Sequence, residues 1–334
     1  MANQDTYGIA QGIREDLSDF IYNISPTDTP VLQAAEWTTA TSTNHEWTED
    51  VLEPPVANNA KAEGASMATP DAVSGGTRLG NYTQISRKTY GVSGTAEVVT
   101  KVGRDSEIAF GRAKSMRELK TDIDMAICAG NNPKNAGTAG VGGNPRRSAS
   151  LDCWIRNASR GSGGADPATF DGAASDGLSP LATSRAFSQA FLDTTIEKCW
   201  NEGGRPSLLV LGGEGRKKFA TFDGVGAGTN TMRTDRSEKT VYGTVDVYIS
   251  SYGIDLRAVN SRHLRKQPAG TGGLVDRDAW LIDPEHIKVA YLRPYEIEEF
   301  AKTGDSIEEA VQAEWTLQVD NTRAHGLVAD LKGA

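Results

Sequence analysis

The chain has 334 residues, of which 38% are hydrophobic, and this length is enough to form more than one lobe with its own core. Its formal net charge of -9 argues against broad, sequence-independent adhesion to nucleic acid, which depends on Lys and Arg displacing counterions from phosphates. No segment approaches the apolar length of a membrane-spanning helix. The three cysteines are odd in number and far apart, which argues against a disulfide framework.

Residues 1–16 contain no basic stretch followed by an apolar run, so we expect no secretory signal and a protein that stays in the cytosol where it is made. A short amphipathic helix is predicted over residues 11–22. Pro26 and Pro30 follow and prevent the helix from continuing, because proline lacks an N–H donor and restricts the residue before it. Residues 1–43 are therefore predicted to form a largely extended N-terminal arm.

Two segments that favour an extended backbone flank a long polar stretch. Residues 45–52 and 82–99 are rich in Thr, Tyr, Ile and Val and are predicted to be strands. Residues 54–80, between them, hold no aromatic residue and few large apolar ones, so burial within this stretch cannot offset the entropy of ordering it. The sequence thus predicts a projecting hairpin that needs another molecule to lie on. Lys61, in its tip, is interpreted as a solvated lysine.

A long amphipathic helix is predicted over residues 105–130, with Asp105 as its cap and Gly130 as its stop. At 1.5 Å per residue it would span roughly 39 Å, about the width of a domain. Charged residues, including Lys120, Asp122 and Asp124, fall mostly off the apolar stripe. The predicted stripe consists of Ile108, Ala109, Ala113, Met116, Leu119, Ile123, Ala126 and Ile127.

The segment that follows, residues 130–180, is rich in Gly, Asn, Ala and Ser and is predicted to be loop, anchored by Trp154 and Ile155. A second amphipathic helix is predicted from residue 184 to the glycines at 203–204. In residues 311–319 apolar and polar residues alternate, which is typical of a half-buried strand. The remaining predicted strands are 207–211, 241–250, 279–282 and 287–292, so the overall pattern is mixed α+β.

Residues 212–218 (GGEGRKK) follow a predicted strand, at the place where a phosphate-binding loop would lie. They lack the Walker spacing, and position 218 is Lys instead of the third Gly of a dinucleotide loop, so we interpret them as a tight strand-to-helix turn. No Gly-X-Ser-X-Gly elbow is present. None of the histidines shows zinc-ligand spacing: they are His45, His263, His286 and His325.

Short charged clusters are interpreted as solvated surface, or as groups that face a neighbouring subunit. The basic clusters are 146–147, 216–218 and 262–266, and the acidic pairs are 49–50, 298–299 and 308–309. The sequence therefore predicts no catalytic residue, no cofactor-binding residue and no metal ligand. We expect that the protein is not an enzyme.

Several local phrases resemble the major capsid proteins of tailed bacteriophages, which have the Hong Kong 97-like fold. The order of arm, long hairpin, long helix and mixed α+β lobe is similar as well. The phrases are DLSD (16–19), ISPTDTP (24–30), HEW (45–47), VSGT (92–95), ELK (118–120), DVY (246–248), AYLRP (290–294) and AKTGD (301–305). The resemblance runs over about the whole chain.

The resemblance implies an α+β, Hong Kong 97-like fold with an N-terminal arm, an extended β-hairpin loop, a long spine helix, and peripheral and axial domains. The implied division is as follows: residues 1–43 form the arm, 44–99 the extended hairpin loop, 100–204 the spine helix and peripheral domain with a Gly-rich insertion, 205–284 the axial domain, and 285–334 the return strands of both domains.

The implied function is structural. The chain would assemble with copies of itself into the pentamers and hexamers of an icosahedral head, and this head would contain double-stranded DNA without sequence-specific binding. The implied partners are scaffolding, portal and decoration proteins but no membrane, with assembly in the host cytoplasm and a final location in the virion. No long, charged helical segment precedes the arm, so a separate scaffold and a removed leader are both compatible with the sequence.

Two alternatives remain open at this point. An encapsulin-type cellular compartment would use the same fold to enclose protein cargo instead of DNA. A cytosolic enzyme would use the hairpin as a flexible lid over a substrate, and would stay monomeric.

Overall fold

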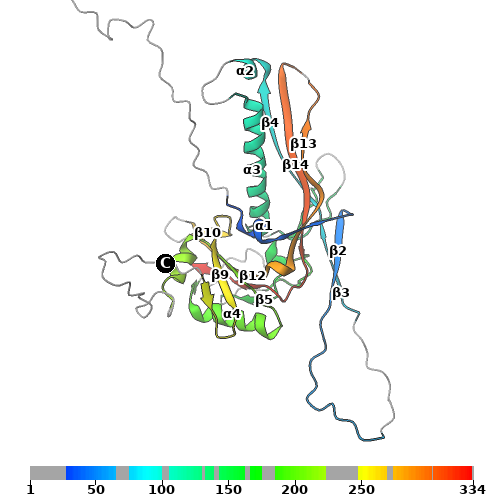
Figure 1. Cartoon of the computed structure of the whole chain (residues 1–334), viewed down its shortest axis with the longest axis vertical. Helices are drawn as coiled ribbons and strands as arrows, with labels where there is room; N and C mark the ends of the chain where they lie inside the picture. The colour runs from blue at the N-terminus through cyan, green and yellow to red at the C-terminus, as the bar shows by residue number, and fades with distance from the viewer. Residues whose placement is uncertain are drawn as a thin grey trace, which may run out of the picture.

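The computed structural model describes residues 28–64, 75–99, 105–129, 132–138, 143–161, 166–174, 185–222, 247–268, 274–302 and 304–332. These residues form an α+β molecule with a long helix-and-sheet lobe, a more compact lobe at its base, and a hairpin loop that projects away from both (Figure 1). The predicted helix over residues 11–22, the predicted stop at Gly130 and most of the predicted strand 241–250 lie outside the described residues.

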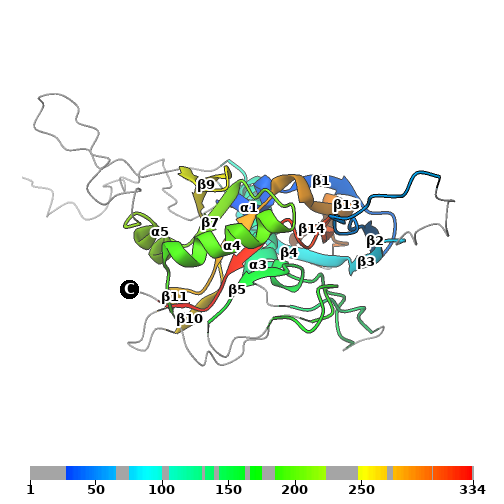
Figure 2. The same ribbon diagram turned by 90° about the horizontal axis from the view of Figure 1, so that it is seen from below.

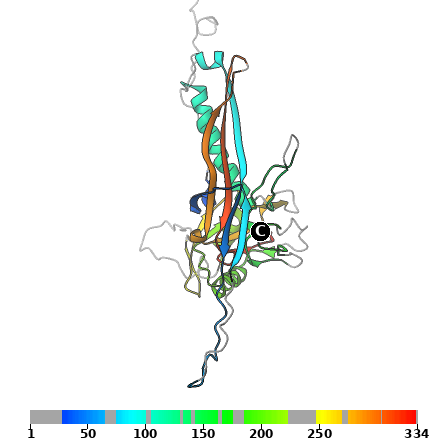
Figure 3. The ribbon, with the colours of Figure 1, turned by 90° about the vertical axis from the view of Figure 1, so that its right-hand side faces the viewer.

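The long lobe is a four-stranded sheet in the order β1-β13-β14-β4, with a helix along it (Figure 3). β1 runs parallel to β13, and the other neighbours are antiparallel. The helix α3 (Glu107–Ala129) packs against β4 and β14, and a short helix α2 (Gly94–Val98) lies at the tip. The strands are β1 (Glu36–Thr39), β13 (Ile287–Glu299), β14 (Ser306–Val319) and β4 (Gln84–Ser93).

The compact lobe is a six-stranded mixed sheet in the order β5-β15-β12-β7-β9-β8. The helix α4 (Gln189–Asn201) packs against β5 and β15, and α5 (Gly213–Phe219) packs against β7 (Figure 2). The strands are β5 (Asn157–Ser159), β15 (Gly326–Val328), β12 (Ala279–Ile282), β7 (Leu208–Leu211), β9 (Asp255–Asn260) and β8 (Val247–Ile249).

Smaller elements connect these lobes. Next to the long lobe, the helix α1 (Pro30–Ala34) packs against α3, and β2 (Asn44–Glu49) pairs with β3 (Thr77–Tyr82) to form the root of the hairpin. The others are β6 (Arg185–Ala186) with β16 (Leu331–Lys332), β10 (Lys266–Pro268) with β11 (Leu274–Asp276), and two 3-10 turns, η1 (Leu151–Cys153) and η2 (Pro284–His286).

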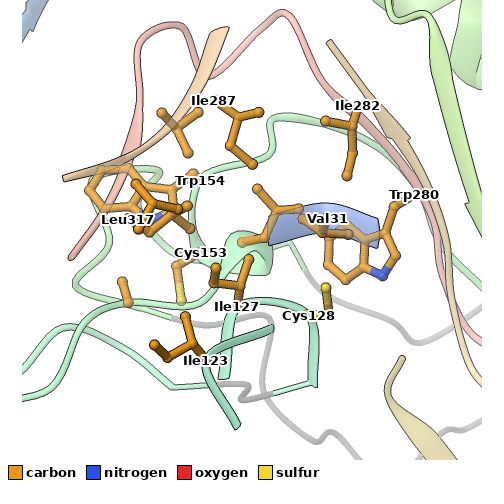
Figure 4. Packing of buried hydrophobic residues seen from close by; sticks show 14 of the residues in the cluster. Val31, Ile123, Ile127, Cys128, Cys153, Trp154, Trp280, Ile282, Ile287 and Leu317 are labelled. Atoms are coloured by element: carbon orange, nitrogen blue, oxygen red, sulfur yellow. The ribbon is translucent and has the colours of Figure 1, made fainter. Parts of the chain in front are cut away.

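The six-stranded sheet is covered on both faces, which explains why all four residues of β7 are buried. Leu208 and Val210 belong to one core, together with residues of α3 and the long sheet, while Leu209 and Leu211 belong to a second core under α4 and α5. Figure 4 shows the first core, where side chains from α1, α3, β12, β13 and β14 converge. This core joins the two lobes.

The predicted long helix is confirmed as α3, and three residues of its predicted stripe, Leu119, Ile123 and Ile127, are buried. The prediction was wrong for Ala109 and Ala113, which are exposed, because α2 and the sheet cover only part of the first turns. These alanines do not contribute to the apolar stripe in the folded chain.

Two polar positions of α3 also differ from the prediction. Ser106 caps the helix in place of Asp105, because its hydroxyl accepts a hydrogen bond from the Ala109 N–H at 3.1 Å. Asp124 was expected off the stripe but is fully buried, since α1 packs against this part of α3.

Residues 82–99 were predicted to form one strand, the second arm of the hairpin, and this prediction was wrong. β2 pairs with β3, which ends at Tyr82; after a one-residue break at Thr83 the chain enters β4, which pairs with β14. Thr83 is buried and its hydroxyl donates to the Glu314 carboxylate at 2.8 Å, which fixes the chain between the two strands. After Ser93, whose hydroxyl accepts from the Ala96 N–H, the chain is the helix α2 and not a strand.

The last strand is longer and more buried than predicted. β14 begins at Ser306 and is an inner strand between β13 and β4, and most of its residues from Glu309 onward are buried, on both faces of the strand. Glu314 and Thr316, expected to face solvent, are buried. The predictions of a buried strand at 207–211 and of Trp154 and Ile155 as apolar anchors are confirmed, because these residues are buried as β7 and beside η1.

Candidate assembly surfaces

The hairpin is fixed at its root by contacts with distant parts of the chain. The Trp47 ring packs against the buried Trp154 ring with centroids 5.2 Å apart. Glu49, the last residue of β2, accepts hydrogen bonds from the Thr322 N–H at 3.1 Å and from the Thr322 hydroxyl at 2.9 Å. The expectation that Glu49 faces solvent or a neighbour was therefore wrong. These contacts set the direction in which the hairpin leaves the body.

Beyond this root lies the hairpin loop, residues 50–76, of which 50–64 and 75–76 are described. Every residue from 50 to 64 is exposed, including the apolar Val51, Leu52 and Val56, whose exposed fractions are 47%, 90% and 71%. Figures 1 and 3 show this segment leaving the body. Lys61 is exposed, as interpreted from the sequence. Apolar side chains that remain exposed in the subunit are candidate contacts for a partner.

A second surface, which we call the Trp37 cleft, lies between α1, β1, β13 and α3. It has a volume of about 280 Å³. Trp37, on the edge strand β1, is 66% exposed. Trp37 was not predicted as a site residue, although a lone Trp in the polar segment EWTT is the kind of residue that anchors interfaces. The side chains that line the cleft include Leu32, Ala35, Trp37, Lys120, Tyr291 and Tyr295.

The aromatic rings that line the cleft pack against one another. The centroids of Trp37 and Tyr291 are 6.1 Å apart, and those of Tyr291 and Tyr295 are 5.6 Å apart with their hydroxyl oxygens at 3.4 Å. Burial raises the pKa of both tyrosines, which therefore stay neutral. The Lys120 ammonium lies 5.7 Å from the Tyr295 ring centroid. The cleft is an aromatic surface with one cation at its rim.

A third exposed apolar surface is the tip of the long lobe, where Val98, Val99 and Phe110 are 85%, 57% and 37% exposed. Below it, the Arg112 guanidinium makes two hydrogen bonds with the buried Glu309 carboxylate, at 2.7 and 3.1 Å. Arg112 lowers the pKa of Glu309 and holds it ionised. The expectation that Glu309 faces solvent or a neighbour was therefore wrong.

The strand-to-helix turn at Gly212 is confirmed between β7 and α5. The Asp276 carboxylate accepts a hydrogen bond from the Glu214 N–H at 3.0 Å, and a Cβ at Gly212 would lie 2.0 Å from this carboxylate. A protein carboxylate thus fills the helix terminus where a phosphate group would bind. The close approach of Asp276 explains why position 212 is glycine, and no bound nucleotide is needed to account for it.

The described histidines do not form a metal-binding cluster. His325 is fully buried: its Nδ1 accepts from the Asp283 N–H at 3.2 Å, its Nε2 lies 3.3 Å from the His286 carbonyl oxygen, and burial lowers its pKa to about 4. The His45 Nε2 lies 2.7 Å from the Gln318 Oε1. Within the described ranges, no group of three or more His, Cys, Asp or Glu is placed to hold a metal ion. Nor does any described helix have the length and apolarity to cross a membrane.

In two of the basic clusters one arginine pairs with a buried carboxylate, so the interpretation as solvated surface was wrong for Arg146 and Arg265. Arg146 contacts the buried Glu314 carboxylate at 2.6 Å. Arg265 is 3% exposed and is paired with the buried Asp278. Both arginines therefore stabilise the subunit itself.

Comparison with known proteins now decides the family. A family model described as SU10 major capsid protein matches residues 2–332. The chain belongs to this family. A major capsid protein of Escherichia phage Phieco32 is 30% identical over 119 residues, which are 36% of this chain. The matched part covers about a third of that relative, 34% of its length.

Solved structures support the fold independently. A cyanophage A-1(L) capsid chain superposes with a TM-score of 0.63 at 11% identity, covering 98% of each chain. A chain of Mycobacterium phage Cain superposes with a TM-score of 0.60 at 12% identity, again covering 98% of each. The expected α+β, Hong Kong 97-like fold is confirmed. The family places the chain among structural proteins of phage capsids and does not favour the encapsulin alternative.

Proposed function

We propose that this member of the SU10 major capsid protein family forms the pentamers and hexamers of an icosahedral phage head that encloses double-stranded DNA. The DNA is contained without sequence-specific binding, in keeping with the net charge of -9. Assembly takes place in the host cytoplasm, together with portal, scaffolding and decoration proteins.

The hairpin loop is the observation that carries this proposal. Residues 50–64 are exposed throughout, yet the hairpin is held at its root by Glu49 and Trp47. Because its root fixes its direction and its residues are exposed, the loop is suited to contact another subunit. In a closed shell such a contact repeats at every equivalent interface, so many weak contacts add to a stable assembly.

We further propose that the parts of the chain divide as the capsid resemblance implies. Residues 1–43 serve as the arm, 44–99 supply the extended loop and the strand that returns from it, 100–204 the spine helix and peripheral domain, 205–284 the axial domain, and 285–334 the return strands. The axial domains gather around the five-fold and six-fold axes.

Purification of the recombinant protein tests the proposal, with sedimentation velocity and negative-stain microscopy as the readouts. We expect capsomers, sheets or closed shells whose amount rises with protein concentration. A compact monomer at every protein and salt concentration would contradict the proposal, and turnover of a substrate by that monomer would favour an enzyme with a hairpin lid. Particles from infected cells should contain double-stranded DNA, whereas particles filled with a protein cargo would contradict that part.

A further inference from the structure

The first part of the hairpin loop, residues 51–56 (VLEPPV), has a conformation that its own sequence restricts. Pro54 and Pro55 each fix their φ near -65°, and Pro55 also excludes the helical region for Pro54. The segment is thereby biased toward polyproline II, a left-handed helix with three residues per turn. Its ordering on a partner surface therefore costs less entropy than that of an ordinary loop.

In that conformation, residues three positions apart share an edge. Leu52 and Pro55 lie along one edge, and Glu53 and Val56 lie along the next. Leu52 is 90% exposed and Val56 is 71% exposed. The segment thus presents an apolar edge beside a second edge that carries one carboxylate.

The Trp37 cleft has the features that bind such a segment. Grooves lined with aromatic side chains bind polyproline II segments, which lie across the rings. Trp37, Tyr291 and Tyr295 supply three neighbouring rings, and the exposed Trp37 can donate its indole N–H to a backbone carbonyl of a segment whose prolines have no N–H. Trp and Tyr are also the residues that contribute most to the binding energy of interfaces.

The charges at the cleft match as well. The Lys120 ammonium lies over the Tyr295 ring at the rim, and it is complementary to the Glu53 carboxylate of the segment. The other charged residue of the lining, Glu36, has its carboxylate 3.6 Å from the Lys288 ammonium, which also contacts the Asp320 carboxylate at 2.8 Å. A negative charge on the segment is therefore favoured at the Lys120 end of the cleft.

The segment cannot reach the cleft of its own subunit in the observed structure. β2 directs it away from the long sheet (Figures 1 and 3), and all residues from 51 to 64 are exposed. If this segment binds in the cleft, it must therefore come from another copy of the chain. This is a head-to-tail contact between two different patches, which is the kind that generates rings.

We infer that residues 51–56 of one subunit bind in the Trp37 cleft of its neighbour as a polyproline II segment, with Glu53 facing Lys120. The inference rests on the proposed assembly into a shell and names the surface that receives the hairpin. It assigns to Trp37 and Tyr295 the role of the main apolar anchors at this contact, with the buried Tyr291 ring packed between them and the core.

Charge reversal tests the pairing. Glu53→Lys and Lys120→Glu, each alone, should lower the yield of sedimenting shells about ten-fold, because a small loss per contact is multiplied over the shell. The two changes together should restore most of the parent yield. Glu63→Lys is the matched control, since it reverses a charge in the same loop outside the segment, and it should assemble like the parent. Equal defects in the single and double variants would overturn the pairing.

A cross-link tests the contact itself. Subunits that carry Leu52→Cys are mixed with differently tagged subunits that carry Gln33→Cys, on the exposed side of α1, and the assembled particles are oxidised. A disulfide between the two tags is expected, and neither variant should cross-link alone because Cys128, Cys153 and Cys199 are buried. Circular dichroism and thermal melting should match the parent, since the altered residues are exposed.

Two results would overturn the inference and leave the proposed function intact. One is parent-like shell yield for Glu53→Lys together with no cross-link. The other is loss of assembly in Trp37→Ala but not in Leu52→Ser or Glu53→Lys, which would assign the cleft to a different occupant, such as residues 1–27 of the chain. Failure of the parent protein itself to assemble would instead contradict the proposed function.

Discussion

The Asp124 carboxylate of α3 accepts a hydrogen bond from the Leu32 N–H of α1 at 2.9 Å. The first N–H groups of any helix lack partners within the helix, and Thr29, the residue before α1, makes no side-chain cap bond. Asp124 thus caps α1 from a position 92 residues away. Burial raises the pKa of Asp124, so its charge is costly while its role as an acceptor is useful.

We therefore expect Asp124→Ala to destabilise the subunit by about 1 to 3 kcal/mol, because it leaves a buried N–H without a partner. Asp124→Asn keeps an acceptor oxygen and removes the buried charge, so its cost should be clearly smaller. Urea denaturation of both variants measures the difference. If Asp124→Asn is as unstable as Asp124→Ala, the charge and not the acceptor stabilises this contact.

The buried face of α3 gives a second prediction. Leu119 is fully buried, and Leu119→Ala should lower the free energy of unfolding by about 2 to 5 kcal/mol and reduce the yield of soluble protein. Lys120→Ala, one position away on the exposed face, is the control for subunit stability and should melt like the parent. The opposite order of melting temperatures would mean that the assigned face is wrong.

The buried His325 predicts a specific pH dependence. Its pKa falls from 6.5 in the unfolded chain to about 4 in the folded one, so between these values the unfolded chain binds the extra proton. Stability is therefore complete above about pH 6.5 and is lost as the pH falls toward 4, by up to about 3 kcal/mol from this residue.

Denaturation of the parent and of His325→Gln at pH values from 7 to 4 measures this contribution. Whatever the variant costs at pH 7, its stability should fall less steeply than that of the parent over this interval. Parallel curves for the two proteins would show that His325 does not titrate in this way.

Elements with a strong local pattern could be predicted from the sequence. The apolar steps of α3 and the run of buried residues in β7 depend only on neighbouring positions, and both elements form where expected. Residues 82–99 were wrongly predicted to be one strand because their composition favours strands throughout. The break at Thr83 is set by its hydrogen bond to Glu314, which is distant in the sequence.

The candidate surfaces were predictable to different extents. The hairpin loop follows from composition alone, because a long segment with few apolar residues cannot bury itself. The Trp37 cleft does not, since it combines α1, β1, α3 and β13, and the pairing of these segments is a tertiary feature. Glu309 was missed for the same reason, because its partner Arg112 lies 197 residues away.

The role of the hairpin loop in assembly is the central claim, and a shortened hairpin tests it most directly. Residues 51–75 are replaced by an Asn-Gly turn, which leaves β2 and β3 paired and their contacts with Trp154 and Thr322 in place. Because residues 51–64 are exposed, and because loop shortening changes closure entropy only modestly, the subunit should fold with an unchanged circular dichroism spectrum.

Negative-stain microscopy of this variant is the decisive measurement. The loss of one contact at every equivalent interface should leave few or no closed particles, although the subunit is folded. Normal, stable shells from the folded variant would contradict the claim and would show that the hairpin loop has no role in joining subunits.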